Sequence, residues 1–261
     1  MTGAVALAGM AALRGGAGLV RLAVADCCLD TVAAFEPSYM TAPLPDDEAG
    51  RIAPTAYERI MELADAATVI ACGPGLGRSA GLDQLVGRLY QEIAKPLVVD
   101  ADGLNALASQ REVLASAPGA RILTPHPGEF ARLNPSVGRG DSVFQREHAA
   151  IEMALRSRIV VVLKGHRTLV TDGQRQWHNF TGNPGMATGG SGDSLTGLIT
   201  ALACQGLEAY DAARLGVFLH GLAGDLAAKE LGQVSLIAGD LVRYLPAAFR
   251  QLEKLGIANR G

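Results

Sequence analysis

GNPGMATGGSGDSLTG, at residues 182–197, is the most informative segment of this chain for its fold. Gly189, Gly190 and Gly192 permit backbone conformations that other residues resist, so several N–H groups can point at one anion. A helix is predicted to begin at Ser191, and its positive end adds to this attraction. The segment lacks the lysine and the spacing of a P-loop. It therefore predicts a different phosphate-binding turn, one that opens a helix.

Asp193 lies at the start of this predicted helix, beside the phosphate-binding turn. A carboxylate there can remove a proton from a hydroxyl group while backbone amides stabilise the transferred phosphoryl group. The alternative is that Asp193 only caps the helix next to a flexible loop. The first interpretation predicts a nucleotide-dependent enzyme.

Short apolar runs alternate with segments of helical periodicity along the rest of the chain. The predicted strands cover 19–24, 68–72, 96–100, 120–123 and 159–163, and the predicted helices 5–13, 55–63, 82–93, 104–114, 143–156, 191–204, 209–229 and 238–255. Continuous apolar strands between helices indicate a mostly parallel sheet with helices on both faces. Asp172–Gly173, flanked by 167–171 and 174–179, predicts a late β-hairpin.

The composition excludes several classes of partner. With 49% hydrophobic and 19% charged residues, the chain is globular rather than disordered. Its net charge of −3 gives no electrostatic footprint for nucleic acid, and no apolar run is long enough to span a membrane. The four cysteines, Cys27, Cys28, Cys72 and Cys204, form no CxxC pair. They predict buried, reduced thiols in a cytoplasmic protein.

Unusual residue groups follow the predicted strands. They are GPGLG at 73–77, DADGLN at 100–105, TPHPGE at 124–129 and Lys164–Gly165. Ligands of open α/β sheets bind outside the carboxyl ends of the strands. Four such groups on one sheet edge therefore predict a binding site.

These motifs, with ALRGGAGLVRLAV at 12–24, VLKG at 162–165 and NPGMATGGSGD at 183–193, resemble those of the ATP/ADP-dependent NAD(P)H-hydrate dehydratases of the ribokinase-like superfamily. The resemblance covers essentially the whole chain, in the expected order. It implies a single domain over 1–261, a ribokinase-like three-layer sandwich with a mostly parallel central sheet, helices on both faces and the late hairpin.

The resemblance also implies a reaction. These enzymes use ATP or ADP, with Mg²⁺, to phosphorylate the ring hydroxyl of the S epimer of hydrated NADH or NADPH, and loss of phosphate regenerates NAD(P)H. It further implies a homotetramer in the cytoplasm. Two rivals stay open: a small-molecule kinase of the same fold, acting on a vitamin precursor or sugar, and a catalytically inactive nucleotide-binding protein.

Individual site residues follow from the matched motifs. The resemblance implies Asp193 as catalytic base and as a substrate contact, an anion hole of Gly190, Ser191 and Gly192, nucleotide binding by Lys164, Gly165, His166, Arg167, Thr168 and Gly192, and contacts to the hydrated dinucleotide from Ala4, Gly75, Gly77 and His126.

Carboxylates at the strand ends are candidate magnesium contacts. Asp102 and Glu129 are predicted to approach the ion, through water, because Mg²⁺ prefers oxygen ligands and keeps part of its hydration. Asp100 and Asn105 are further candidates. Asp102 could instead cap the next helix, and the stem of Lys164 could simply cover the sheet edge.

Two features depart from the family pattern. The family pattern places a strand ahead of the MTGA motif at residues 1–4, and this sequence is predicted to lack it. Ser194 occupies a position that is usually apolar, and a small effect is expected.

Overall fold

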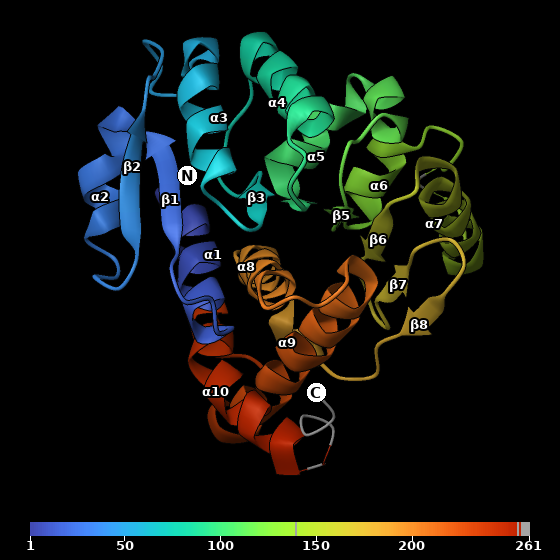
Figure 1. The fold of residues 1–261 in the computed structure, drawn as a ribbon. Helices are drawn as coiled ribbons and strands as arrows, with labels where there is room; N and C mark the ends of the chain where they lie inside the picture. Colours follow the sequence, from blue (N-terminus) through green and yellow to red (C-terminus); the bar gives the residue numbers. More distant parts are fainter. Residues whose placement is uncertain (139, 255, 257–261) are drawn as a thin grey trace.

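The computed structural model describes residues 1–138, 140–254 and 256. Its centre is a six-stranded sheet of order β3-β4-β5-β6-β7-β8 (Figure 1). The strands are β3 (Ile70–Cys72), β4 (Leu97–Val99), β5 (Arg121–Leu123), β6 (Val160–Leu163), β7 (Leu169–Thr171) and β8 (Gln176–His178). β3 to β6 are parallel, and β7 and β8 form an antiparallel hairpin at one edge. The predicted sheet and hairpin are confirmed.

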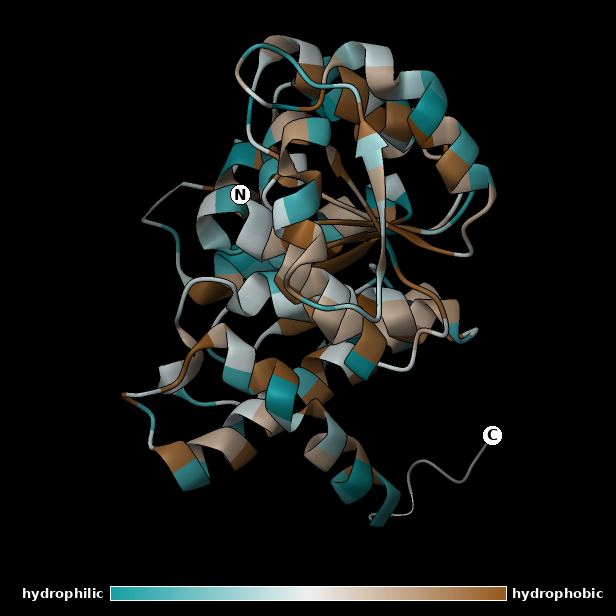
Figure 2. Cartoon of the chain, turned by 90° about the vertical axis from the view of Figure 1, so that its left-hand side faces the viewer, coloured by the Kyte–Doolittle hydropathy of each residue, from teal (hydrophilic) through white to brown (hydrophobic). Residues whose placement is uncertain are grey.

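Successive side chains of a strand point to opposite sides of the sheet. The central strands therefore place apolar residues on both of its faces. Val99 and Leu123 face a core shared with α4 (Ala80–Glu92), α5 (Ala101–Ala108), α6 (Pro127–Leu133) and α7 (Val143–Ser157). Val98 and Ile122 face α8 (Ser191–Cys204) and α9 (Ala209–Leu231). Figure 2 shows the brown, hydrophobic strands enclosed between helices. The predicted helices on both faces are confirmed.

Two further helices, α1 (Thr2–Arg14) and α10 (Ala238–Lys254), pack against α8 and α9. Small residues permit this: a Cβ on Gly197 of α8 would lie 1.9 Å from the carbonyl oxygen of Ala8. α8 is therefore enclosed by the sheet, α1 and α9. The predicted helix over 238–255 is described as far as Lys254, and the remainder of the predicted domain at 255 and 257–261 lies outside the described residues.

A separate two-stranded parallel sheet pairs β1 (Arg21–Ala25) with β2 (Met40–Leu44). Between them lie η1 (Asp26–Cys28) and α2 (Leu29–Ala33). β2 was not predicted, because Pro43 within MTAPL argues against a strand. The remaining elements are η2 (Pro54–Ala56), α3 (Tyr57–Asp65), η3 (Arg111–Ala115) and η4 (Pro184–Met186).

The helices and the cysteines bear on two predictions made from composition. Among the helices of the described chain, none is both long and apolar enough to cross a membrane. All four cysteines are free, but Cys27 is exposed and the other three are half-buried. The prediction of buried thiols was wrong for Cys27, which lies in η1 at the surface rather than in the core. Cys72, by contrast, packs against the core, and burial raises the pKa of its thiol to about 11.

Candidate active site

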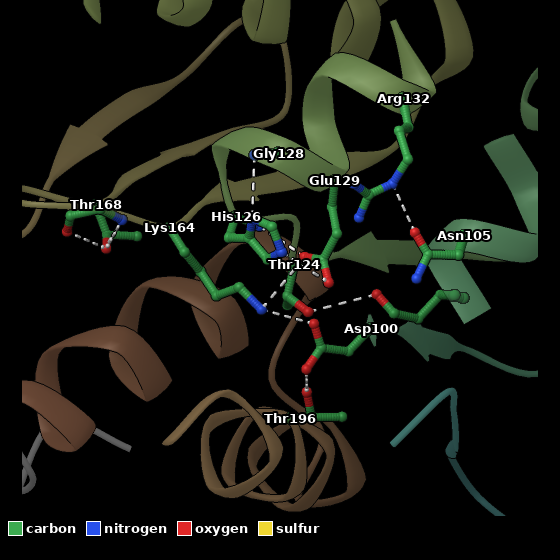
Figure 3. A network of polar contacts seen from close by, with 12 residues as sticks. Asp100, Asn105, Thr124, His126, Gly128, Glu129, Arg132, Lys164, Thr168 and Thr196 are labelled. Carbon is green, nitrogen blue, oxygen red and sulfur yellow. Dashed lines mark hydrogen bonds and ion pairs between the residues drawn. The ribbon is translucent and has the colours of Figure 1, made fainter. Parts of the chain in front are cut away.

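Polar residues follow three parallel strands at one edge of the sheet and converge (Figure 3). Asp100 follows β4 and Lys164 follows β6. The ammonium nitrogen of Lys164 lies 2.7 Å from Oδ1 of Asp100 and 3.8 Å from Oε2 of Glu129 in α6. Lys164 is thus held by carboxylates, rather than only covering the sheet edge with its stem.

Asp100 is the buried anchor of this group, with 1% of its surface exposed. Thr196 of α8 donates a hydrogen bond of 2.8 Å to its Oδ2 atom. Burial would raise the pKa of Asp100, but the positive charge of Lys164 and the hydrogen bonds outweigh it, so the pKa lies below its ordinary value. Both carboxylate oxygens are therefore engaged, which argues against the magnesium role considered for Asp100.

Asp193 lies in the first turn of α8, which is also part of this site. Burial raises the pKa of Asp193 to about 6, the negative charge of Asp100 adds to the rise, and Lys164 opposes it. A carboxyl group with this pKa is mostly ionised at neutral pH and still accepts a proton readily. The environment of Asp193 therefore suits a general base.

The residues that precede Asp193 are those predicted to bind an anion. Gly190 has φ +90°, and a Cβ there would lie 2.6 Å from Cδ1 of Leu7. A Cβ on Gly192 would lie 3.2 Å from the ammonium nitrogen of Lys164. In the described chain, no side chain caps this helix start. Its amide groups and Lys164 therefore present positive charge to the same place.

The GPGLG turn after β3 contacts two other predicted site residues. Gly75 has φ +67°, and a Cβ on it would lie 3.1 Å from Cβ of Ala4. The amide of Gly77 donates a 2.9 Å hydrogen bond to Oδ2 of Asp102. Asp102 therefore holds the glycine turn, and its carboxylate is not the cap of α5 that was considered.

His126 begins α6 and has a structural role there. Its Nδ1 atom accepts a hydrogen bond of 3.0 Å from the amide of Gly128, while its own amide donates to Oε2 of Glu129 at 2.8 Å. The imidazole is 51% exposed, so its outer edge is open to a ligand. α6 was not predicted, although Pro127 at the first position and Glu129 at the third are helix-start signals.

The stretch after Lys164 forms a compact turn. The amide of Gly165 donates to Oγ1 of Thr168 at 3.3 Å, and that hydroxyl donates to the carbonyl of Gly165 at 3.1 Å. His166 and Arg167 are exposed. The guanidinium carbon of Arg167 lies 5.4 Å from the ring centre of Phe180, which is itself 75% exposed. The turn thus extends from the carboxylate cluster to an exposed aromatic side chain.

The carboxylates of the site suit a hydrated metal ion better than one coordinated only by protein side chains. Within the described residues, no three His, Cys, Asp or Glu side chains are placed to hold a metal by themselves. Asp102 and Glu129 each have one oxygen engaged by an amide, and Asn105 accepts a 2.8 Å hydrogen bond from Arg132 (Figure 3). Mg²⁺ usually keeps several waters and binds substrate phosphates, which fits such a donor set.

Comparison with known proteins agrees with this geometry. The family model described as NAD(P)H-hydrate dehydratase matches residues 1–247. This chain belongs to that family. The bifunctional NAD(P)H-hydrate repair enzyme Nnr of Moorella thermoacetica is 45% identical over 97% of this chain and 48% of its own length. The chain thus spans about half the length of this relative.

Solved structures of similar proteins support the same assignment. The ADP/ATP-dependent NAD(P)H-hydrate dehydratase of Bacillus subtilis, co-crystallised with ATP/Mg²⁺, is 29% identical, with a TM-score of 0.78 over 96% of this chain and 87% of that one. A ribokinase-like superfamily protein of Enterococcus faecalis is 24% identical, with a TM-score of 0.77 over 95% of this chain and 82% of that one. The chain therefore has the ribokinase-like fold predicted for this family member.

Some further residues of the site had a signal in the sequence and one had none. Thr196 is four residues after Gly192 and therefore on the same face of α8, and Thr124, which donates to the carbonyl of Val99 at 3.4 Å, begins the TPHPGE motif. His220 of α9 is identified only through its contact with Ser194.

Proposed function

We propose that this chain dehydrates the S epimer of hydrated NADH or NADPH at the expense of ATP or ADP. The observation that carries the proposal is Asp193, a carboxyl group with a pKa of about 6 in the first turn of α8, a helix start that no side chain of the described residues caps. The family assignment names the hydroxyl group on which such a base acts.

The reaction proceeds in two steps. Asp193 removes the proton of the ring hydroxyl, the oxygen bonds to the terminal phosphorus of the nucleotide, and the bond from that phosphorus to the nucleotide's bridging oxygen breaks. Then the carbon–oxygen bond of the ring phosphoester breaks, phosphate leaves with the electron pair, and a neighbouring ring carbon loses a proton to form the double bond. ATP and the hydrate yield ADP, phosphate, a proton and NAD(P)H.

The surrounding residues have distinct tasks in this scheme. The amides of the turn from Gly190 to Gly192 stabilise the charge on the transferring phosphoryl group. Lys164, fixed by Asp100, adds positive charge beside them. His166, Arg167 and Thr168 line the path of the nucleotide, with the Lys164–Gly165 backbone.

Ala4, Gly75, Gly77 and His126 form the side on which we place the hydrated dinucleotide. Gly75 packs closely on α1, since a Cβ on it would lie 3.1 Å from Cβ of Ala4, so the two residues lie on the same side of the site. Asp102 and Glu129 would hold Mg²⁺ through water beside the nucleotide phosphates, and the ion would there neutralise phosphate charge.

The test is restoration of reduced-nicotinamide absorbance from hydrated NADH or NADPH with Mg²⁺ and either ATP or ADP. Recovery that depends on nucleotide supports the proposal. Absence of recovery, with phosphate transferred to a pyrimidine, thiazole or sugar alcohol, would replace it by the small-molecule kinase. Nucleotide binding without any turnover would favour the inactive protein.

The family resemblance also supports a homotetramer that acts in the cytoplasm as one domain. Leu19, Phe35 and Met40, near the two-stranded sheet, are 83%, 50% and 38% exposed, and they offer apolar surface for association. Light scattering after gel filtration tests the assembly, and a mass of one subunit would contradict it.

A further inference from the structure

Helix α9 holds the beginning of the segment 182–197 in place. Oδ2 of Asp225 accepts a hydrogen bond from the amide of Gly182 at 2.8 Å, and Oδ1 accepts one from the side chain of Asn183 at 3.0 Å. A Cβ on Gly221 would lie 2.2 Å from Oγ1 of Thr181. The first residues of the segment are therefore fixed against one face of α9.

The same helix reaches the other end of the segment through His220. Its Nε2 atom lies 3.1 Å from Oγ of Ser194, and both residues are buried, with exposed fractions of 7% and 1%. His220 thus contacts the residue one position after Asp193.

The donors and acceptors around His220 are mutually consistent. The hydroxyl of Ser194 donates to the carbonyl of Ser191 at 2.8 Å, which leaves its oxygen to accept from the imidazole. Burial lowers the pKa of His220 to about 4. The ring is therefore neutral at physiological pH and acts as a hydrogen-bond donor, not as a charge.

We infer that His220 and Ser194 are positioning residues, which fix the first turn of α8 and thereby aim the Asp193 carboxylate and the amides of the anion-binding turn. The inference rests on the proposed function for the identity of the reaction. Its physical reason is that phosphoryl transfer is catalysed mainly by placement and electrostatics. A turn without a side-chain cap needs another constraint, and the hydrogen bonds from α9 provide it.

The test compares His220→Phe, which keeps a ring but loses the donor, with His220→Gln, which keeps an N–H donor. We expect His220→Phe to lower kcat about 10- to 100-fold, with the KM for nucleotide changed less than about threefold. His220→Gln should recover most of the loss. The double variant with Ser194→Ala should have nearly the same kcat as His220→Phe alone, because both changes remove the same Ser194–His220 hydrogen bond.

Met153→Ala is the matched control, since Met153 is also buried but belongs to the core on the opposite face of the sheet. Amide hydrogen exchange by mass spectrometry gives a readout that does not depend on the substrate. Exchange over 189–194 should accelerate in His220→Phe and stay unchanged in Met153→Ala.

The outcomes separate the two proposals. A wild-type chain that restores no NAD(P)H refutes the proposed function, while the exchange measurement still decides whether His220 fixes the turn. Unchanged exchange over 189–194, a fall in activity that only follows the folded fraction, or absence of rescue by His220→Gln would each overturn the positioning role.

Discussion

Replacing Asp193 by asparagine removes the proposed base and leaves the shape of the side chain nearly unchanged. General-base catalysis contributes about 10²- to 10⁴-fold in rate, so kcat should fall by that factor. With a pKa of about 6, the wild-type carboxyl group is about 90% ionised at pH 7. kcat/KM should therefore fall about tenfold per pH unit below pH 6, and this acid limb should be absent from Asp193→Asn.

The same substitution should make the folded protein more stable. The pKa of Asp193 is about 6 in the folded chain against an ordinary value of 3.8, so the folded state binds the proton more tightly than the unfolded state. Ionisation of Asp193 then does not destabilise the folded state below pH 3.8. Its destabilising effect grows between pH 3.8 and pH 6, and above pH 6 it reaches about 1–2 kcal/mol, because solvent screens this partly exposed group. The free energy of unfolding of Asp193→Asn should exceed that of the wild type by up to this amount at pH 7. The difference should disappear as the pH falls toward 4.

The assay combines restoration of reduced-nicotinamide absorbance across pH with urea unfolding of the same samples. Asp211→Asn, a change of carboxylate to amide in α9 next to the exposed Arg214, is the control and should alter neither profile. Activity of Asp193→Asn within about threefold of wild type, or a persistent acid limb, would refute the role of Asp193 as base. Lower stability at pH 7 would refute the electrostatic account of its environment.

Three further changes test other parts of the site. Lys164→Met leaves Asp100 buried without its partner and should lower the free energy of unfolding, measured in urea, by about 3–5 kcal/mol. Adding Asp100→Asn should restore part of this stability. Unchanged stability of Lys164→Met would contradict the account of Lys164 and Asp100 as a buried ion pair. Gly73→Ala should lower the melting temperature strongly or prevent folding, because its Cβ would lie 1.8 Å from the carbonyl oxygen of Asp100. Gly3→Ala, which meets no atom within 4 Å, should be tolerated, and equal effects of the two would refute the steric argument. Chelation of Mg²⁺ with EDTA should abolish restoration of NAD(P)H and re-addition should recover it, whereas turnover in EDTA would exclude the predicted metal requirement.

The central sheet was predictable because its strands are continuous apolar runs bounded by turn residues. LVV at 97–99 and VVVL at 160–163 are short runs rich in β-branched residues, which favours strands buried on both faces. Their parallel order then places the residues after each strand at one edge. The convergence of Asp100 and Lys164 follows from this topology.

The contacts within the site were not predictable in the same way. Periodicity places a residue on a face of its own helix and does not reveal which side chain of another helix meets it. Spacing places Thr196 on the site face of α8, but its partner Asp100 is set by the packing of α8 against the sheet. His220 meets Ser194 through the packing of α9 on α8, and no sequence pattern marks it. The local failures, β2 and α6, both involve prolines, whose meaning depends on whether an edge strand or a helix start is being formed.

The length of chain between interacting residues has a consequence for folding kinetics. Lys164 lies 64 residues after Asp100, and Thr196 lies 96 residues after it. Closing such long loops is entropically costly, and parallel pairing of distant strands forms slowly. Helices can form within microseconds, long before these contacts. A refolding chain should therefore regain its far-ultraviolet circular dichroism first, and its ability to bind and turn over nucleotide in the last kinetic phase.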